Sequence, residues 1–187
     1  MKNLLKDKFF RSHEHSSPFY GNTRHIYCEH STIEFNPRSD SMNNYKSHYG
    51  HVQKLRILAY AEDEHAQTIL VYSVDSNDSH RSMNKYPHVA ISVSNVKPYT
   101  AVYSNDLWKR LVDDGIVEIT MDEYDKPQSI TIKDHTNEWH GKLNSNGRYE
   151  ETQAYVKIIN EIIDLDGIVC VGNLWENDKC QKYLKIK

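Results

Sequence analysis

The sequence predicts an α+β fold in which strands outnumber helices. Several segments are rich in β-branched and aromatic residues and end at polar turns, which is typical of strands. Two later segments carry apolar residues at helical spacing. The helices do not alternate regularly with the strands, so a parallel βαβ winding is not predicted. A chain of 187 residues is long enough for one generous domain and too short for two ordinary ones.

The first elements are an arm, a strand and a loop. Residues 1–22 are polar and basic-leaning and are expected to form an N-terminal arm, while residues 23–187 form a single domain. Residues 25–35 predict the first strand because they are rich in β-branched and aromatic residues and end at an Asn-Pro pair. The polar residues 38–50 are expected to be a surface loop.

A β-hairpin and a further strand are expected next. Residues 52–60 alternate between apolar and polar side chains, residues 62–64 make a solvated acidic turn, and residues 66–74 form the second strand. After a polar loop at 75–85, residues 88–93 predict a short, strongly apolar strand.

The second half begins with a helix and two strands. Ser104-Asn105-Asp106 precedes an apolar face in residues 107–112 and is typical of a helix N-cap, and Gly115 ends the helix. Residues 116–121 and 129–133 then predict two strands.

Residues 150–164 predict the strongest helix of the chain. Acidic residues occupy its first turn, and Gly167 follows its end. The apolar residues at helical spacing are Tyr155, Val156, Ile159, Ile162 and Ile163. A last buried strand is expected at 168–171.

Composition favours a cytoplasmic protein without a membrane partner. The apolar fraction is 38% and the charged fraction 26%, and no stretch approaches the roughly 18 to 20 apolar residues of a membrane helix. The first residues lack the apolar core of a signal peptide. The three cysteines are odd in number and form no CxxC pair, so neither a disulfide framework nor a cysteine zinc site is expected.

The net charge of the chain bears on whether it binds nucleic acid. A net charge of -3 argues against broad binding to duplex nucleic acid, which usually needs a basic surface. It is compatible with a small nucleotide or an RNA end held in a locally positive pocket. The sequence does not decide the oligomeric state.

Two predicted strands each carry a histidine at a comparable place. Side chains on a strand repeat every two residues, so His30 is expected to share a face with Thr32, and His88 with Ser92. Neighbouring strands would bring both imidazoles to one cleft. There one histidine would take a proton from water or a ribose hydroxyl and the other would donate one to the leaving oxygen. Hydroxyls would hold the phosphate oxygens, and neither a metal nor a cofactor is required.

These residues resemble a known signature. The pattern H-x-[ST]-hydrophobic, occurring twice and separated by several tens of residues, is that of the 2H phosphoesterase superfamily. His30-Ser31-Thr32-Ile33 matches it, and His88-Val89-Ala90-Ile91 matches except at Ala90, where the family has Thr or Ser. Residues 84–89, 96–98 and 103–105 are similar to the second-motif region of 2H-like domains related to RNA-repair proteins and to the cyclic-phosphodiesterase part of tRNA ligases. The resemblance is strongest over residues 23–112.

The resemblance implies a bilobal 2H-phosphoesterase-like antiparallel sheet with flanking helices. It also implies a metal-independent phosphodiesterase that acts on the cyclic phosphate of a nucleotide, an RNA end or a small oligonucleotide. His30 and His88 would be its acid–base pair, and Thr32 would bind the phosphate. Because Ala90 has no hydroxyl, Ser92 or Lys97 is expected to replace the missing phosphate contact, and Tyr99 to reach a phosphate or stack on a base.

Other interpretations remain open. Both histidines could be structural, with His88 bonded to the backbone after Pro87. A module that has lost turnover through Ala90 would bind or sequester a nucleotide or RNA terminus. Alternatively, residues 113–187 could form a protein-interaction surface beside a vestigial cleft.

The sequence predicts neither a metal site nor a kinase site. His135 and His140 lie five residues apart with acidic neighbours, but the HExxH arrangement is absent and the segment is expected to be a loop or short exposed helix, so no metal is expected. The 7 glycines include no Gly-rich phosphate loop, so the sequence does not support a kinase or NTPase activity.

Overall fold

A long hairpin forms the middle of the main sheet. In the computed structural model, β2 (Val52–Asp63) pairs antiparallel with β3 (Ala66–Ser73). Asp63 closes the turn, because its Oδ1 accepts hydrogen bonds from the backbone N–H groups of His65 and Ala66, each at 2.8 Å. The hairpin predicted from the alternation of residues 52–60 and 66–74 is therefore confirmed. The structure describes residues 24–26, 31–35, 38–74, 81–94, 98–100 and 102–169.

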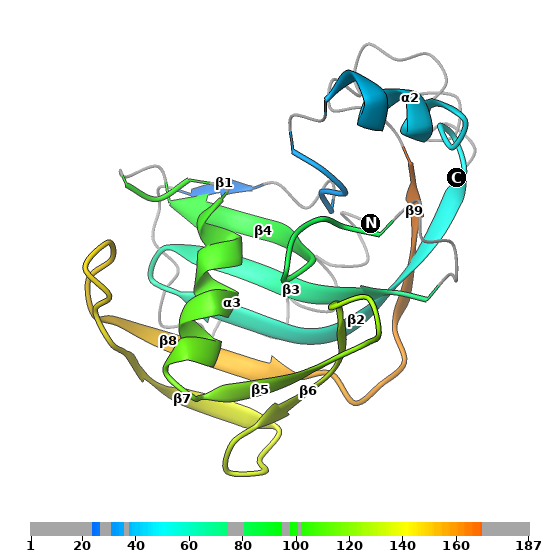
Figure 1. Cartoon of the computed structure of the whole chain (residues 1–187). Coiled ribbons are helices and arrows are strands. Elements are labelled where there is room, and N and C mark those ends of the chain that lie inside the picture. Colours follow the sequence, from blue (N-terminus) through cyan, green and yellow to red (C-terminus); the bar gives the residue numbers. More distant parts are fainter. Residues whose placement is uncertain are drawn as a thin grey trace.

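The main sheet is antiparallel and has seven strands in the order β1-β4-β3-β2-β8-β7, with β9 also pairing with β2 (Figure 1). The bounds of the further strands are β1 Arg24–Ile26, β4 His88–Ser94, β7 Glu138–Leu143, β8 Thr152–Ile158 and β9 Asp164–Ile168. β2 is long enough to serve two neighbours, since its residues 59–63 pair with β8 and its residues 52–56 pair with β9. The strand predicted at 88–93 is confirmed as β4.

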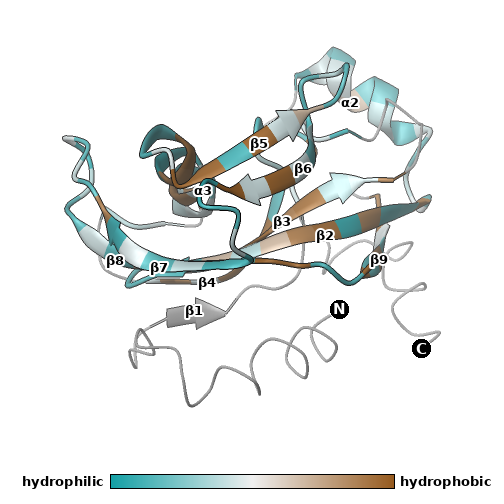
Figure 2. Cartoon of the chain, turned by 90° about the horizontal axis from the view of Figure 1, so that it is seen from below, coloured by the Kyte–Doolittle hydropathy of each residue, from teal (hydrophilic) through white to brown (hydrophobic). Residues whose placement is uncertain are grey.

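One face of the sheet is covered by α3 (Tyr103–Asp113) and by the separate hairpin of β5 (Val117–Met121) and β6 (Pro127–Ile132) (Figures 1 and 2). Its core residues include Leu70 and Val93 from the sheet and Trp108 from the helix. A second cluster, which includes Ile57, Ile69 and Val89, occupies the opposite face. The α+β class and the two strands around Asp125 are confirmed. The helix is also present, but it begins at Tyr103 with Val102 at the N-cap position, so the predicted cap residues Ser104-Asn105-Asp106 lie inside it. The bilobal 2H-like arrangement stays a prediction.

The predicted helix over residues 150–164 is wrong, because this stretch holds β8, an irregular link at 159–163 and the first residue of β9. In β8 the burial alternates with the period of a strand, and Thr152, Ala154 and Val156 are buried. The helical spacing arises because Tyr155 and Val156 lie in β8, whereas Ile159, Ile162 and Ile163 lie in the irregular link that follows it. The β-branched residues of this stretch favour strands. The strand expected at 168–171 is also misplaced, because β9 ends at Ile168 and residues 170–171 lie outside the described part.

Two other elements differ from the expectation. The stretch 38–50 contains a helix, α2 (Ser39–Lys46), and the segment expected to be a loop or short exposed helix around His140 is β7. α2 has no buried residue, so it offers no apolar periodicity to detect. β7 ends the described sheet, and its Glu138 and Lys142 form ion pairs of 2.6 and 2.7 Å with Lys157 and Glu151. The arm predicted at 1–22 lies outside the described residues.

A rise in pH should weaken the attachment of α2. The Tyr45 hydroxyl donates a 2.9 Å hydrogen bond to Glu34, and burial together with this carboxylate raises the pKa of Tyr45 from 10.0 to about 12. Because the pKa is higher in the folded state, the contribution to the free energy of unfolding is complete below the unfolded value and is lost as the pH rises through the folded value. We expect urea unfolding to show a smaller difference between the wild type and Tyr45→Phe at about pH 11 than at about pH 9. A constant difference would contradict this assignment.

Candidate functional site

His88 begins β4, and the residues just before it orient its ring. Its Nδ1 lies 2.8 Å from the carbonyl oxygen of Tyr86. A carbonyl can only accept, so Nδ1 carries the hydrogen and the lone pair of the neutral ring is on Nε2. The bond to backbone that a structural histidine was expected to make is therefore present. The same bond fixes the tautomer that a general base requires.

The segment that carries Thr32 lies along the edge of β4. Ser31 forms an antiparallel bridge with Val89, so Thr32 and His88 occupy the next pair of facing positions on one side of the sheet. The loop 81–86 also holds this segment. The Ser82 hydroxyl donates to the Thr32 carbonyl at 2.5 Å, and the Met83 backbone N–H donates to the Ile33 carbonyl at 2.5 Å. The structure thus brings together two of the predicted site residues.

His30 and Lys97, also predicted for the site, lie outside the described residues. In the chain, His30 directly precedes Ser31, the residue that forms the bridge with β4.

Ser92 does not share a face with His88, so that expectation is wrong. The pairing of β3 with β4 shifts in register: Thr68 faces Ala90, but Gln67 faces Ser92. The extra residue between Ala90 and Ser92 breaks the alternation of the strand, as a β-bulge does. The Ser92 hydroxyl donates to Gln67 Oε1 at 2.7 Å, and Gln67 donates in turn to Tyr60, which belongs to the cluster on the opposite face.

Tyr99 lies at the other end of β4. Its ring stacks on His65 with a centroid distance of 3.5 Å and on Tyr149 at 5.6 Å, and it is buried. The carbonyl of His65 accepts a hydrogen bond from Ser94, the last residue of β4. The six residues back to His88 correspond to about 20 Å along a strand. Tyr99 is therefore a packing residue in this structure and lies away from Thr32 and His88.

A buried charged network lies next to this aromatic cluster. Asp63 Oδ2 accepts a 2.5 Å hydrogen bond from the Tyr103 hydroxyl, which also accepts one from Arg110 at 2.5 Å. Burial raises the pKa of both Asp63 and Tyr103. Arg110 further donates to the carbonyls of Asn144 and Glu150 at 3.0 and 2.8 Å. The network joins the β2–β3 turn to α3 and to the β7–β8 connection. The expectation that Asp63 lies in a solvated acidic turn is therefore wrong, because its side chain is buried.

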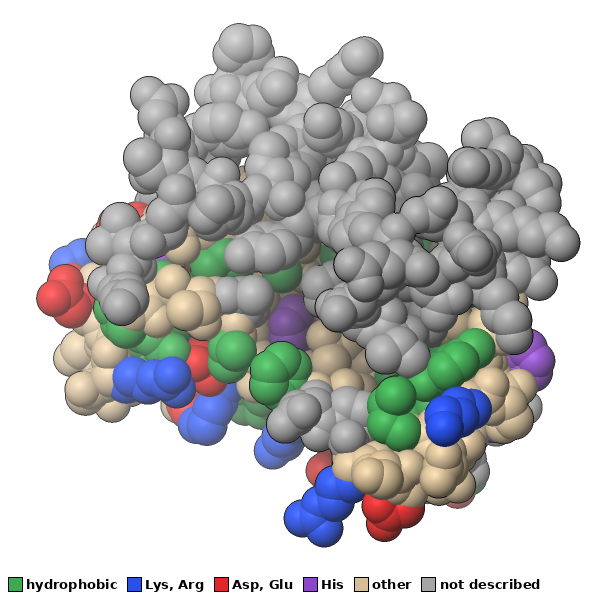
Figure 3. Space-filling view, turned by 90° about the horizontal axis from the view of Figure 1, so that it is seen from above, with side chains coloured by type: hydrophobic (Ala, Val, Ile, Leu, Met, Phe, Trp, Pro, Cys, Tyr) green, Lys and Arg blue, Asp and Glu red, His purple; other side chains and the backbone are tan. Residues whose placement is uncertain are grey.

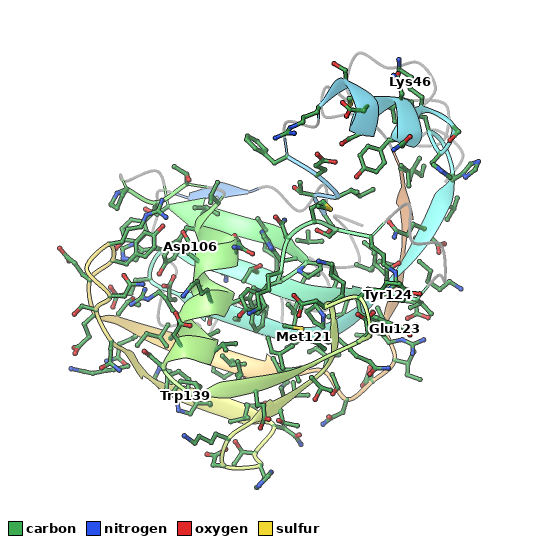
Figure 4. The ribbon with its side chains drawn as sticks, in the orientation of Figure 1. Lys46, Asp106, Met121, Glu123, Tyr124 and Trp139 are labelled. Atoms are coloured by element: carbon green, nitrogen blue, oxygen red, sulfur yellow. The ribbon has the colours of Figure 1, made fainter. Side chains whose placement is uncertain are left out.

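The tip of the β5–β6 hairpin, where Figure 4 labels Tyr124, contacts the same loop that holds Thr32. Arg81 forms a 2.9 Å ion pair with Asp122, and its guanidinium lies 3.7 Å from the centre of the Tyr124 ring. Lys126 Nζ donates to the carbonyl of Asn84 at 3.5 Å. The sequence offered no signal for this association, because the two segments are about forty residues apart in the chain.

Figure 3 shows basic, acidic and hydrophobic side chains of described residues interspersed in the part of one face that the described residues form. Among the described residues, no group of three or more His, Cys, Asp and Glu side chains is placed to hold a metal ion. No helix within the described ranges is long and apolar enough to cross a lipid bilayer.

Comparison with known proteins reveals a similarity of fold. No protein-family model matches the chain, and no curated protein is significantly similar to it in sequence. Its structure is similar to the crystal structure of a fungal RNA kinase, with a TM-score of 0.51 and 14% sequence identity. The similarity covers 89% of this chain but only 41% of the kinase chain. At this identity the likeness shows a shared fold.

Proposed function

We propose that this chain is an RNA-end-processing enzyme of the 2H type, which opens a cyclic phosphate without a metal. The observation that supports this proposal best is the bridge between Ser31 and Val89, because it sets the H-x-T segment beside the second histidine. Thr32 then faces His88 across the pair of strands, and His30 precedes the bridge in the chain.

The chemistry follows from the orientation of His88. A water molecule attacks phosphorus while a neutral imidazole takes its proton, and the bond from phosphorus to one ribose oxygen breaks. The other imidazole, protonated, donates a proton to that oxygen, which leaves a phosphate monoester and a free hydroxyl. The Thr32 hydroxyl stabilises the charge on the non-bridging oxygens. We assign His88 and His30 to the two proton transfers, one as the base and the other as the acid.

The similarity to an RNA kinase supports an RNA end as the substrate, but not transfer of a phosphoryl group from a nucleoside triphosphate. The shared fold covers less than half of the kinase chain. The sequence contains no G-x-x-x-x-G-K-[ST] loop, whose backbone N–H groups cradle the phosphates in P-loop enzymes. Phosphodiester chemistry by a histidine pair needs no such loop.

Ala90 favours a second candidate, a module that binds an RNA terminus or nucleotide without turning it over. Ala90 lies on the same face as His88 and packs against the core next to α3. It therefore contributes no hydroxyl where the family has one. Loss of one donor to a developing negative charge lowers kcat by about 10² to 10³ in other enzymes. Such a loss would leave binding largely intact.

The two candidates are separated by an assay with chelator present. The protein is incubated with 2′,3′-cyclic nucleotides, RNA ends that carry a cyclic phosphate and short cyclic oligonucleotides. We expect turnover that disappears in the His30→Ala/His88→Ala double variant and persists in His140→Ala, which changes an exposed histidine on β7. Binding of these ligands without turnover would favour the binding module. If the protein neither turns over nor binds any of these ligands, both candidates are contradicted.

A further inference from the structure

The connection between β7 and β8 carries the one Asn-Gly pair in the sequence, Asn146-Gly147. Both residues are exposed, and the connection projects at the edge of the molecule (Figure 1). Gly147 has a φ of 80°, and a Cβ atom added to it would meet no other atom within 4 Å. The pair therefore lies in an open turn that water can reach.

The side chain of Asn146 folds back over the residues that follow it. Its Oδ1 accepts hydrogen bonds from the backbone N–H groups of Arg148 and Tyr149, at 3.2 and 3.0 Å. The side chain must pass along the backbone of Gly147 to reach these two donors. Within the described ranges, no hydrogen bond engages the Nδ2 group of Asn146 or the backbone N–H of Gly147.

This arrangement favours a reaction between the Asn146 side chain and the next backbone nitrogen. A nucleophile and a carbonyl carbon held together on one chain react without the cost of bringing two molecules together. The two N–H groups on Oδ1 are placed to stabilise the negative charge that this oxygen acquires when Cγ is attacked. Glycine also lets the backbone adjust toward the ring that forms, because it has no Cβ.

We propose that Asn146-Gly147 is a site of spontaneous deamidation, with water as the co-reactant. The backbone nitrogen of Gly147 loses its proton to hydroxide and attacks Cγ of Asn146, which forms a new N–Cγ bond. The Cγ–Nδ2 bond breaks, Nδ2 takes up a proton, and ammonia leaves a cyclic imide. Water then opens the imide at Cγ to give aspartate, or at the backbone carbonyl carbon to give isoaspartate. No redox partner is needed.

The two products differ in their consequence for the fold. Both ends of the connection are fixed, because Arg110 donates to the carbonyls of Asn144 and Glu150. Aspartate at position 146 keeps the backbone and retains an oxygen for the two N–H donors. Isoaspartate carries the backbone through the former side chain and adds a methylene group between the fixed ends. We therefore expect isoaspartate to break the hydrogen bonds of the turn and aspartate to preserve them.

Peptide mass mapping of the folded, full-length protein after incubation at mildly alkaline pH tests the proposal. We expect the imide, aspartate and isoaspartate at position 146. Asn144 is the matched internal control, since it is exposed in the same connection but precedes Ser145, and it should stay unmodified. Asn146→Gln should lose the modification, because the longer side chain closes a larger ring far more slowly. A synthetic peptide of residues 144–149 gives the rate without the fold.

An Asn146 that stays intact in the folded protein while the peptide converts would overturn the proposal, because the fold would then protect the site. Equal conversion at Asn144 and Asn146 would overturn the role of Gly147. Neither result depends on whether the protein acts on a cyclic phosphate.

Thermal unfolding tests the consequence for the fold. The isoaspartate form, separated by chromatography, should unfold about 2 to 4 °C below the wild type, the shift that loss of one hydrogen bond produces in a protein of this length. Freshly purified Asn146→Asp should unfold at the wild-type temperature, because it carries the new charge on an unaltered backbone. Equal unfolding temperatures for the isoaspartate form and Asn146→Asp would overturn the effect assigned to the added methylene group.

Discussion

Replacing His88 with Asn should lower kcat/KM for a cyclic phosphate by about 10² to 10⁴, the usual contribution of a positioned acid or base. The amide of Asn can still donate a hydrogen bond to the Tyr86 carbonyl, which lies 2.8 Å from Nδ1 in the wild type. It cannot accept or release a proton near neutral pH. The variant therefore removes the proton transfer and keeps the local contact. Kinetics of the purified variant, with circular dichroism and the unfolding midpoint as checks on the fold, measure this effect.

A pH profile separates a chemical role of His88 from a structural one. A pair of histidines that exchanges protons gives a bell-shaped dependence of kcat/KM on pH, and loss of one partner removes one limb. His140→Asn is the matched control, since His140 is exposed on β7, and it should retain the rate and both limbs. A rate for His88→Asn within tenfold of the wild type, with both limbs retained, would show that His88 is structural.

Replacing Asp63 with Ala should destabilise the protein by about 3 to 5 kcal/mol, the usual cost of breaking a buried ion pair from one side. Arg110 would remain buried without its carboxylate, and the Tyr103 hydroxyl would lose its acceptor at 2.5 Å. The backbone N–H groups of the β2–β3 turn would lose theirs as well. The free energy of unfolding in urea measures the effect, provided that the variant is folded enough to give a baseline.

A matched control is an aspartate that is paired at the surface. Asp113 forms an ion pair with Lys109 one turn away on α3, and both side chains are more than half exposed. Asp113→Ala should cost below about 1 kcal/mol, because solvent screens such pairs. If Asp63→Ala costs no more than Asp113→Ala, the network does not stabilise the fold in the way its burial indicates. If Asp63→Ala is obtained only as unfolded protein while Asp113→Ala is folded, the result would support the stabilising role of the network.

Elements whose pattern is local were predictable. The alternation of residues 52–60 and the apolar strand from His88 depend on neighbours two residues apart, and the face of α3 on neighbours three and four apart. The helix predicted at 150–164 is wrong because the apolar residues at helical spacing are divided between β8, which ends at Ile158, and the irregular link before β9. The helix α2 was not predicted for the opposite reason: it buries no residue, and its sequence lacks an apolar stripe.

The candidate site was predictable only where a motif marks it. The H-x-T pattern identified Thr32, and the second motif identified His88. A bulge is a property of two paired strands, so the sequence of β4 alone does not reveal that Ser92 turns to the opposite face. Likewise, no local pattern indicates that the turn carrying Tyr124 packs against Arg81. Both features depend on contacts between distant parts of the chain.

The charged strand at the end of the sheet has a consequence for behaviour at high concentration. No described strand pairs with the outer edge of β7, and an unpaired edge can recruit a strand from another molecule. The exposed Glu138 and Lys142 side chains are engaged in ion pairs with Lys157 and Glu151. An incoming strand would have to desolvate these charges and place its own side chains beside them. The edge is therefore protected against intermolecular β-pairing, and aggregation through it is disfavoured.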